Sequence, residues 1–313
     1  MKASVVIPVR NGGDLFRRCL DAVLGQRFAG EWELVVADTE STDGSLDLVR
    51  SRSAGGPPVR WFSVPPGEFG HGRTRNQLID HAHGEFVALL TQDAVPGTDS
   101  WLRELVETLE AYPEAAGVFG RHVSWPEHGP FIAGATRAHF AGFGPARTCF
   151  RLAEGLDLSS DPARRGFLRY YSDNNSALRK SVWRELPYPD VPFGEDQLWA
   201  ERILEAGYAK AYTPEAWVYH SHRYGFRPAV RRARIEADYY AEVFGDFVGA
   251  PLRPSLRNAW RTVRSQWRSM RGADAGGVRE RLLSARDVFA LHLGHHLSWR
   301  SRRPAKKEGP HGG

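Results

Sequence analysis

The chain has 313 residues with 42% apolar and 25% charged residues and a net charge of +5, which is typical of a globular protein and excludes a fibrous or wholly disordered one. Two cysteines exclude a disulfide framework and a four-cysteine zinc site. No apolar run reaches the roughly 18–20 residues of a membrane span, and the N-terminus lacks a signal-peptide core, so we expect a soluble cytoplasmic protein.

Short apolar runs alternate with helical patterns in the first half of the chain. The runs that predict strands are 4–8, 33–37, 60–64, 85–90 and 116–120. The helices expected between them cover 14–26, with Asp14 as N-cap, a segment starting at 41–44, then 73–82 and 100–111. This alternation predicts an α/β fold with a mostly parallel sheet flanked by helices, in which ligands bind beyond the carboxyl ends of the strands.

The second half is less regular. We expect residues 122–170 to form loops over the site plus a short helix. The elements predicted after them are a strand at 174–179, a helical turn at 180–186, a helix at 195–206 closed by Gly207, and short strands at 211–213 and 217–220.

The C-terminal quarter is strongly basic. Residues 225–313 hold 18 of the 42 Lys and Arg but only 8 of the 37 Asp and Glu. The apolar residues at helical spacing are Trp260, Val263, Trp267 and Met270. The basic stripe, displaced about 100° around the helix, is Arg257, Arg261, Arg264, Arg268 and Arg271.

Three interpretations of this segment stay open. It could be an interfacial helix on anionic lipid, a helical subdomain that packs its tryptophans internally, or a nucleic-acid-binding module, although no recognised nucleic-acid motif is present. A break is predicted at 273–277, a further helix over 278–293, and a loose tail at the end of the chain.

Acids follow two of the predicted strands. Asp38 and Asp93 both come at the carboxyl end of a strand, so we expect them on one rim of the sheet. Asp93 could hold a hard divalent cation or be a solvated loop acid. His220 and His222, two apart on a probable strand, could join it, contact a phosphate, or form an ordinary surface pair.

Two further segments could carry chemistry. Glu195 and Asp196 open a helix about 100° apart, so either they stabilise its positive end or one is a general base. The glycine-rich run 67–76 starts a helix with Arg73 and Arg75, which could hold a diphosphate or be solvated. No Gly-x-Ser-x-Gly elbow occurs, which disfavours a nucleophilic hydrolase.

In this order the motifs resemble the family-2 inverting glycosyltransferases, whose GT-A fold is Rossmann-like. The matching segments are 5–11, Asp38 with 41–44, 72–76, 91–94, 195–199 and 219–222. Segments 68–76, 91–94, 117–121 and 172–176 look most like bacterial rhamnosyltransferases. The sequence departs from the family at Thr91, which replaces the first acid of the Asp-x-Asp metal motif, and at Glu40, where small residues are common.

The resemblance implies a role for each matching residue. Asp196 would be the catalytic base, Glu195 would flank the acceptor, and Asp93 with His220 would hold Mg²⁺ or Mn²⁺. The residues expected to bind the nucleotide sugar are Pro8, Asn11, Asp38, Arg73, Arg75 and Gln92. It also implies a catalytic domain over 1–225, a basic helical extension over 226–300 and a flexible tail over 301–313.

The expected activity is transfer of L-rhamnose from dTDP-L-rhamnose to a hydroxyl of a glycan or lipid-linked acceptor in cell-envelope polysaccharide synthesis, at the inner face of the plasma membrane. A UDP or GDP sugar is the alternative donor. A nucleic-acid-binding protein is the alternative function. A sugar nucleotidyltransferase would need a glycine-rich triphosphate loop, which residues 8–13 lack.

Overall fold

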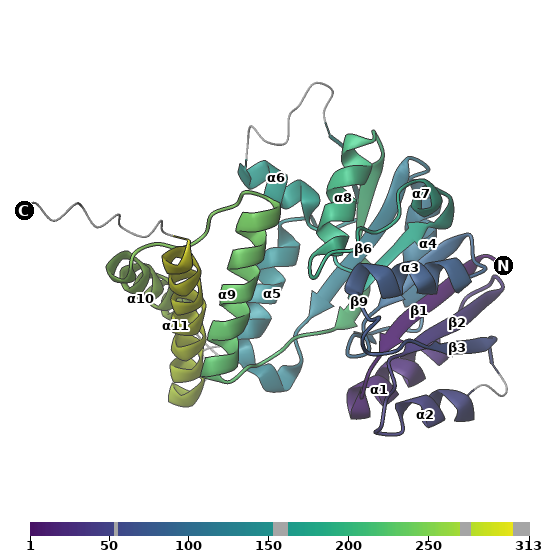
Figure 1. Ribbon diagram of the computed structural model, residues 1–313, viewed down its shortest axis with the longest axis horizontal. Helices are drawn as coiled ribbons and strands as arrows, with labels where there is room; N and C mark the ends of the chain where they lie inside the picture. Colours follow the sequence, from purple (N-terminus) through teal and green to yellow (C-terminus); the bar gives the residue numbers. More distant parts are fainter. Residues whose placement is uncertain (53–55, 153–161, 270–276, 303–313) are drawn as a thin grey trace, which may run out of the picture. The chain divides into compact units, whose positions relative to one another are not determined.

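The computed structural model describes residues 1–52, 56–152, 162–269 and 277–302 (Figure 1). Met270, Arg271, residues 273–276 of the break predicted at 273–277 and the tail from 303 onward lie outside these ranges. The chain divides into two compact units, Met1–Trp125 with Thr136–Ser221 and Pro126–Ala135 with His222–Gly313.

A nine-stranded sheet organises the first unit. Its strands are β1 (Ala3–Val9), β2 (Trp32–Asp38), β3 (Val59–Ser63), β4 (Phe86–Leu90), β5 (Val95–Pro96), β6 (Ala115–Val123), β7 (Thr148–Phe150), β8 (Asn175–Arg179) and β9 (Ala209–Tyr219). They run in the order β3-β2-β1-β4-β8-β6-β9-β5, and β7 pairs with β9. The β3-β2-β1-β4 half is parallel as predicted, whereas β8 runs antiparallel to both β4 and β6 and makes the other half mixed.

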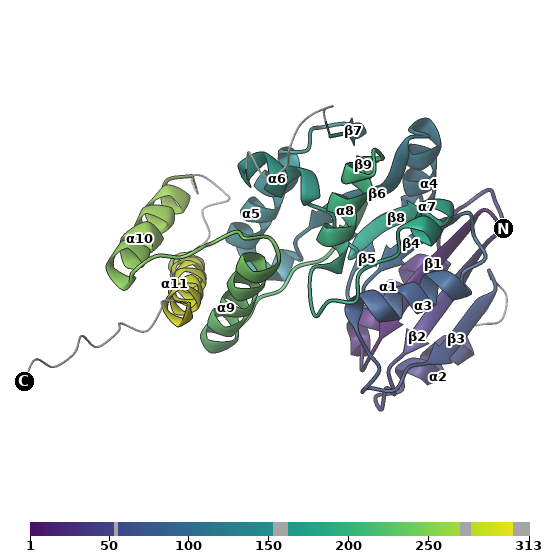
Figure 2. The ribbon, with the colours of Figure 1, turned by 45° about the horizontal axis from the view of Figure 1, so that its top comes forward.

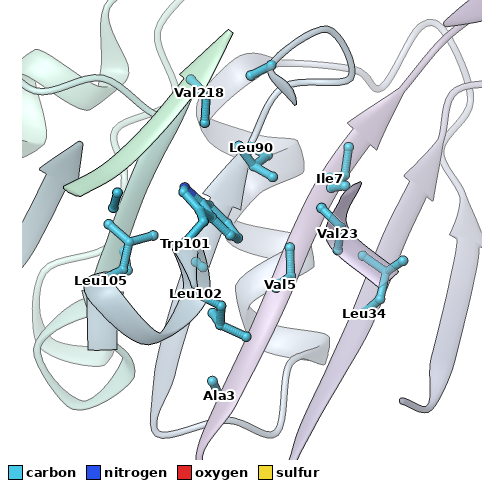
Figure 3. Close-up of a cluster of buried hydrophobic side chains, with 14 of the residues drawn as sticks. Ala3, Val5, Ile7, Val23, Leu34, Leu90, Trp101, Leu102, Leu105 and Val218 are labelled. Atoms are coloured by element: carbon cyan, nitrogen blue, oxygen red, sulfur yellow. The ribbon is translucent and has the colours of Figure 1, made fainter. Parts of the chain in front are cut away.

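Helices cover both faces of this sheet (Figure 1). Those on one face are α1 (Gly13–Leu24), α2 (Ser45–Ser51) and α4 (Trp101–Ala111), and those on the other are α3 (His71–His81), α7 (Lys180–Glu185) and α8 (Glu195–Glu205). Side chains alternate along each strand, so Val5 and Ile7 join the first core with Trp101 (Figure 3), while Val6 joins the second. The predicted helix-flanked α/β fold is therefore confirmed.

The described residues between 122 and 170 hold more regular structure than the loops and short helix that we expected, and 153–161 lie outside the described ranges. After β6 come η1 (Pro126–His128), α5 (Gly129–Ala141), β7 and α6 (Pro162–Arg169). Aromatic rings explain the order here, because Phe140 and Phe143 are buried with Phe119 and Tyr212 in the second core. The glycine and proline residues in this segment favoured a loop prediction, although its aromatic side chains pack into the core.

Two local predictions also differ from the structure. Asp14 does not cap α1, since Gly12 occupies the N-cap without a side-chain bond and the Asp14 carboxylate is exposed. The strands predicted at 211–213 and 217–220 are one strand, β9, whose pairing with β6 shifts register between Gly120 and His122. That irregularity lets β9 continue through Pro214, which cannot donate to a regular ladder.

The second unit contains α9 (Phe226–Val243), α10 (Leu252–Ser269) and α11 (Val278–Ser301). In Figures 1 and 2, α10 and α9 lie on opposite sides of α11. Ala259 and Val263 of α10 are fully buried against Val288 of α11, with Phe131 packed beside them. The predicted C-terminal helices are present, and no helix in the described ranges combines the length and apolar character of a membrane span.

Candidate functional site

The site begins where β1 and β2 end. Asp38, the last residue of β2, pairs in register with Val9, and its side chain is 2% exposed. Its Oδ2 accepts a hydrogen bond from the Ser41 amide at 3.1 Å, whereas its buried Oδ1 has no partner among the described residues. A buried carboxylate oxygen without a donor costs free energy, so this oxygen suits an N–H group of a ligand.

Side chains bind the neighbouring loops to each other. Asn11, at φ +48°, donates its backbone N–H to Ser41 Oγ at 2.9 Å. Its side-chain Oδ1 accepts the backbone N–H of Thr42 at 2.8 Å. Gln92 accepts the Arg10 amide at 2.8 Å and donates to the Arg10 carbonyl at 3.2 Å. Gln92 therefore holds the backbone that follows β1 in place, close in sequence to half-buried Pro8.

Asp93 and His220 meet although 127 positions separate them in the chain. Antiparallel pairing of Val95 with Tyr219 brings the ends of β5 and β9 together. The Asp93 carboxylate then lies 3.7 Å from His220 Nε2, and the two side chains are 22% and 13% exposed. His222 belongs to the second unit.

A carboxylate oxygen and an imidazole nitrogen fit Mn²⁺ and, with more oxygen from a substrate, Mg²⁺. Divalent cations in nucleotide sites commonly take one or two protein ligands and complete their shell with phosphate oxygens and water. Thr91 offers a hydroxyl at the place of the missing acid, and this buried Oγ1 has no partner in the described ranges. The donor set therefore fits a nucleotide-linked cation.

A cluster of three carboxylates surrounds the buried guanidinium of Arg75, on α3. Its Nε lies 3.1 Å from Asp173 Oδ2, and its Nη1 donates to Glu195 Oε1 at 2.5 Å. Asp196 joins through Oδ2, which accepts the Asp173 amide at 3.2 Å. One positive charge thus faces three acids, and the side chains of Asp173 and Glu195 are almost completely buried.

This arrangement raises the pKa of two carboxyl groups in the cluster. Burial, followed by the charges of Glu195 and Asp173, raises the pKa of Asp196 well above its ordinary value. Burial also raises the pKa of Asp173 to about 6 against the opposing effect of Arg75. A raised pKa makes an ionised carboxylate a stronger proton acceptor, which is the property that a general base needs.

The Asp173–Asn174 dipeptide links the carboxylate cluster to the Asp93–His220 pair. The Asp173 amide contacts Asp196, and the Asn174 amide group lies 3.5 Å from His220 Nδ1. Buried His122 packs its ring edge-on against that of His220, with a centroid distance of 5.3 Å. A continuous chain of contacts, through Asn174 and Asp173, therefore joins the Asp93–His220 pair to Asp196.

Two arginines have partners that the sequence did not indicate. Arg73 forms an exposed ion pair with Asp190 at 2.7 Å, and Arg75 is committed to Asp173 and Glu195 rather than to solvent. Glu195 is correspondingly a partner of Arg75. The sequence interpretation missed Asp173, although the polar run 172–176 was part of the family resemblance and could have drawn attention to it.

Comparison with known proteins identifies the family. The family model "Glycosyl transferase family 2" matches residues 4–182, more than half of the chain. The chain belongs to glycosyl transferase family 2. It is an enzyme of the glycosyltransferase class, and its mixed sheet with flanking helices is the GT-A fold.

Relatives and solved structures agree with this assignment. The chain is 28% identical over 236 residues to the O-antigen chain rhamnosyltransferase RfbN of Salmonella typhimurium, covering 74% of this chain and 70% of RfbN. It is 28% identical to WbaN of Salmonella anatum, also named an O-antigen chain rhamnosyltransferase, over 64% of this chain and 60% of WbaN.

Two solved structures share the fold at low sequence identity. The mannosyltransferase PcManGT from Pyrobaculum calidifontis, in complex with GDP-Man and Mn²⁺, has a TM-score of 0.62 at 18% identity over 96% of this chain and 88% of its own. TarS 1–349 of S. aureus, in complex with UDP-GlcNAc, has a TM-score of 0.57 at 16% identity over 96% and 92%.

The carboxylate cluster yields a pH prediction. In Asp173→Asn we expect the pKa of Asp196 to fall, because one of the negative charges that oppose its ionisation is removed. Carboxyl-detected ¹³C NMR titration measures this directly, with Asp196→Asn used to assign the resonance. Asp190→Asn, which neutralises an acid in the Arg73 pair, is the matched control and should leave the titration unchanged. An unshifted Asp196 resonance in Asp173→Asn would contradict the coupling.

Proposed function

We propose that this glycosyltransferase moves a sugar from a nucleotide sugar to an acceptor hydroxyl with inversion at the anomeric carbon, and that Asp196 is its base. The observation that carries the proposal is the position of Asp196, a carboxylate of raised pKa joined through Asp173 and Asn174 to the Asp93–His220 pair. This proposal puts the proton acceptor, Asp196, close to the Asp93–His220 pair, where the diphosphate leaving group would bind.

The donor nucleotide is proposed to lie across the ends of β1 and β2. The unpartnered Oδ1 of Asp38 supports contact with an N–H of the base, as in uracil, thymine or guanine. Pro8 and Asn11 border that end of the sheet, and Gln92 holds its backbone in place. Arg73 and Arg75 are not proposed as direct contacts of the donor, because carboxylates already bind both guanidinium groups.

Asp93 and His220 are proposed to hold Mg²⁺ or Mn²⁺. When bound, such an ion supplies positive charge to the diphosphate of the donor. Asp93 brings a negative charge that favours the cation, and His220 is held in place by Asn174 and by the edge of His122. Burial lowers the pKa of His122 well below its ordinary value, so this ring adds no positive charge beside the pair.

The transfer is a single displacement. The acceptor oxygen attacks the anomeric carbon as its proton passes to the Asp196 carboxylate, and the bond from that carbon to the diphosphate oxygen breaks on the opposite face. One base and one displacement invert the configuration, whereas a glycosidase needs two opposed carboxyl groups at the scissile bond. Glu195 and Asp173 are both tied to Arg75, which leaves Asp196 for the proton.

The proposed donor is dTDP-L-rhamnose, and the proposed acceptor is a glycan or lipid-linked glycan of the cell envelope. The names of RfbN and WbaN support both. PcManGT and TarS, in complex with GDP-Man and UDP-GlcNAc, make GDP and UDP sugars the alternatives. A thermal-shift comparison of dTDP, UDP and GDP with Mg²⁺, followed by mass spectrometry of donor turnover, separates them. Stabilisation by dTDP above the other two is expected, and preference for UDP or GDP would refute the rhamnosyl assignment.

Replacing the base should stop chemistry without preventing binding. In Asp196→Asn we expect transfer to fall by about 10²- to 10⁴-fold, because the amide cannot accept the acceptor proton. Calorimetric affinity for the nucleoside diphosphate with Mn²⁺ should stay within about twofold of the parent. Asp190→Asn serves as the control for a lost surface carboxylate. Near-normal turnover in Asp196→Asn would remove Asp196 from this role.

Replacing the metal ligand should have the opposite signature. In Asp93→Ala we expect nucleoside diphosphate affinity measured with Mn²⁺ to drop at least about tenfold, because a carboxylate ligand is lost. Affinity measured with EDTA should change little. Asp99→Ala, which removes an exposed carboxylate paired with Arg27, is the matched control. Equal affinities for parent and Asp93→Ala in Mn²⁺ would show that Asp93 does not hold the cation.

A further inference from the structure

Helix α10 carries positive charge without any acid. Its 18 residues include no Asp or Glu, and its five arginines are all exposed. They are Arg253, Arg257, Arg261, Arg264 and Arg268. Within the part of the chain that the structure describes, no ion pair connects any of them to a carboxylate, so the helix presents a net charge of +5 to its surroundings.

A row of exposed apolar side chains runs beside these arginines. Leu252, Leu256 and Trp260 follow each other at four-residue intervals and are 46%, 43% and 50% exposed. At 100° per residue, Leu256 and Trp260 occupy the arc between the buried seam of Ala259 and Val263 and the arginine row, while Leu252 lies over the seam at the exposed start of the helix. Around the helix, the order is therefore buried seam, exposed apolar row, arginine row.

Trp260 of the apolar row is fixed in position, and two further exposed apolar side chains precede the helix. The Trp260 ring packs edge-on against Phe289 of α11, with a centroid distance of 5.3 Å, which holds it at the surface. Phe247 and Val248, in the segment just before α10, are 78% and 38% exposed. In Figures 1 and 2 α10 lies on the side of α11 away from α9, so α9 does not cover this row.

We propose that this surface docks on an anionic phospholipid membrane. Leu252, Leu256 and Trp260 would enter the boundary between headgroups and acyl chains, while the arginines bind headgroup phosphates. Nucleic acid would satisfy the arginines equally well, but it offers no apolar layer in which two exposed leucines could be buried. The proposal goes beyond sugar transfer and holds whichever donor the enzyme uses.

Flotation of the full chain with vesicles tests the proposal. Binding to phosphatidylglycerol–phosphatidylcholine vesicles should greatly exceed binding to pure phosphatidylcholine and should weaken as salt is raised. Neutralising one arginine near an anionic surface reduces partitioning about fivefold, so R257Q/R261Q/R264Q should lose about 100-fold. L256Q/W260Q should lose binding while retaining the positive charge.

The matched controls make the same kinds of substitution, apolar to Gln and Arg to Gln, on helices α9 and α11. I235Q/L282Q replaces exposed apolar residues of α9 and α11, and R227Q/R231Q neutralises exposed arginines of α9. Both should float like the parent, and unchanged thermal midpoints show that every variant folds. Equal flotation on neutral vesicles, or parental flotation by L256Q/W260Q, would overturn the proposal. So would binding of a labelled oligonucleotide through the same arginines with no flotation on anionic vesicles. Nucleoside diphosphate binding reports separately on the transfer site.

Discussion

A single buried guanidinium faces three carboxylates in the first unit, and this imbalance of charge sets the character of the site. Arg75 holds Asp173 and Glu195 directly, and thereby connects α3, the segment before β8 and the start of α8. Removing one partner of such a buried pair commonly costs about 3–5 kcal/mol of stability. Burial, together with the charges of Glu195 and Asp173, outweighs the opposing effect of Arg75 and keeps the pKa of Asp196 raised.

The topology of the sheet explains why the site comes together at one place. Antiparallel β8 lies between β4 and β6, so residues 173 and 174, just before β8, reach the rim where β4 ends. The long strand β9 returns beside β5 and delivers His220 to Asp93. A purely parallel sheet would lack this insertion, and Asp196 would then have no route of contacts to His220.

Local patterns in the sequence predicted most elements to within a few residues, because period-two and period-3.6 hydrophobicity reflects which face is buried. They also placed Asp38 and Asp93 at strand ends. They could not assign partners, since nothing local distinguishes an Arg75 that binds Glu195, 120 positions away, from a solvated one. For the same reason Asp173 was missed. In 122–170 the burial of Phe140 and Phe143 depends on distant Phe119 and Tyr212, which glycine-rich local sequence does not reveal.

The central claim is that one rim binds the nucleotide, the cation and the base together. Anomalous diffraction from crystals soaked with Mn²⁺ and a nucleoside diphosphate tests it most directly. We expect a manganese peak within bonding distance of the Asp93 carboxylate and His220 Nε2, the nucleobase against Asp38, and Asp196 facing the diphosphate side. A peak elsewhere, or a nucleobase bound away from Asp38, would contradict the account.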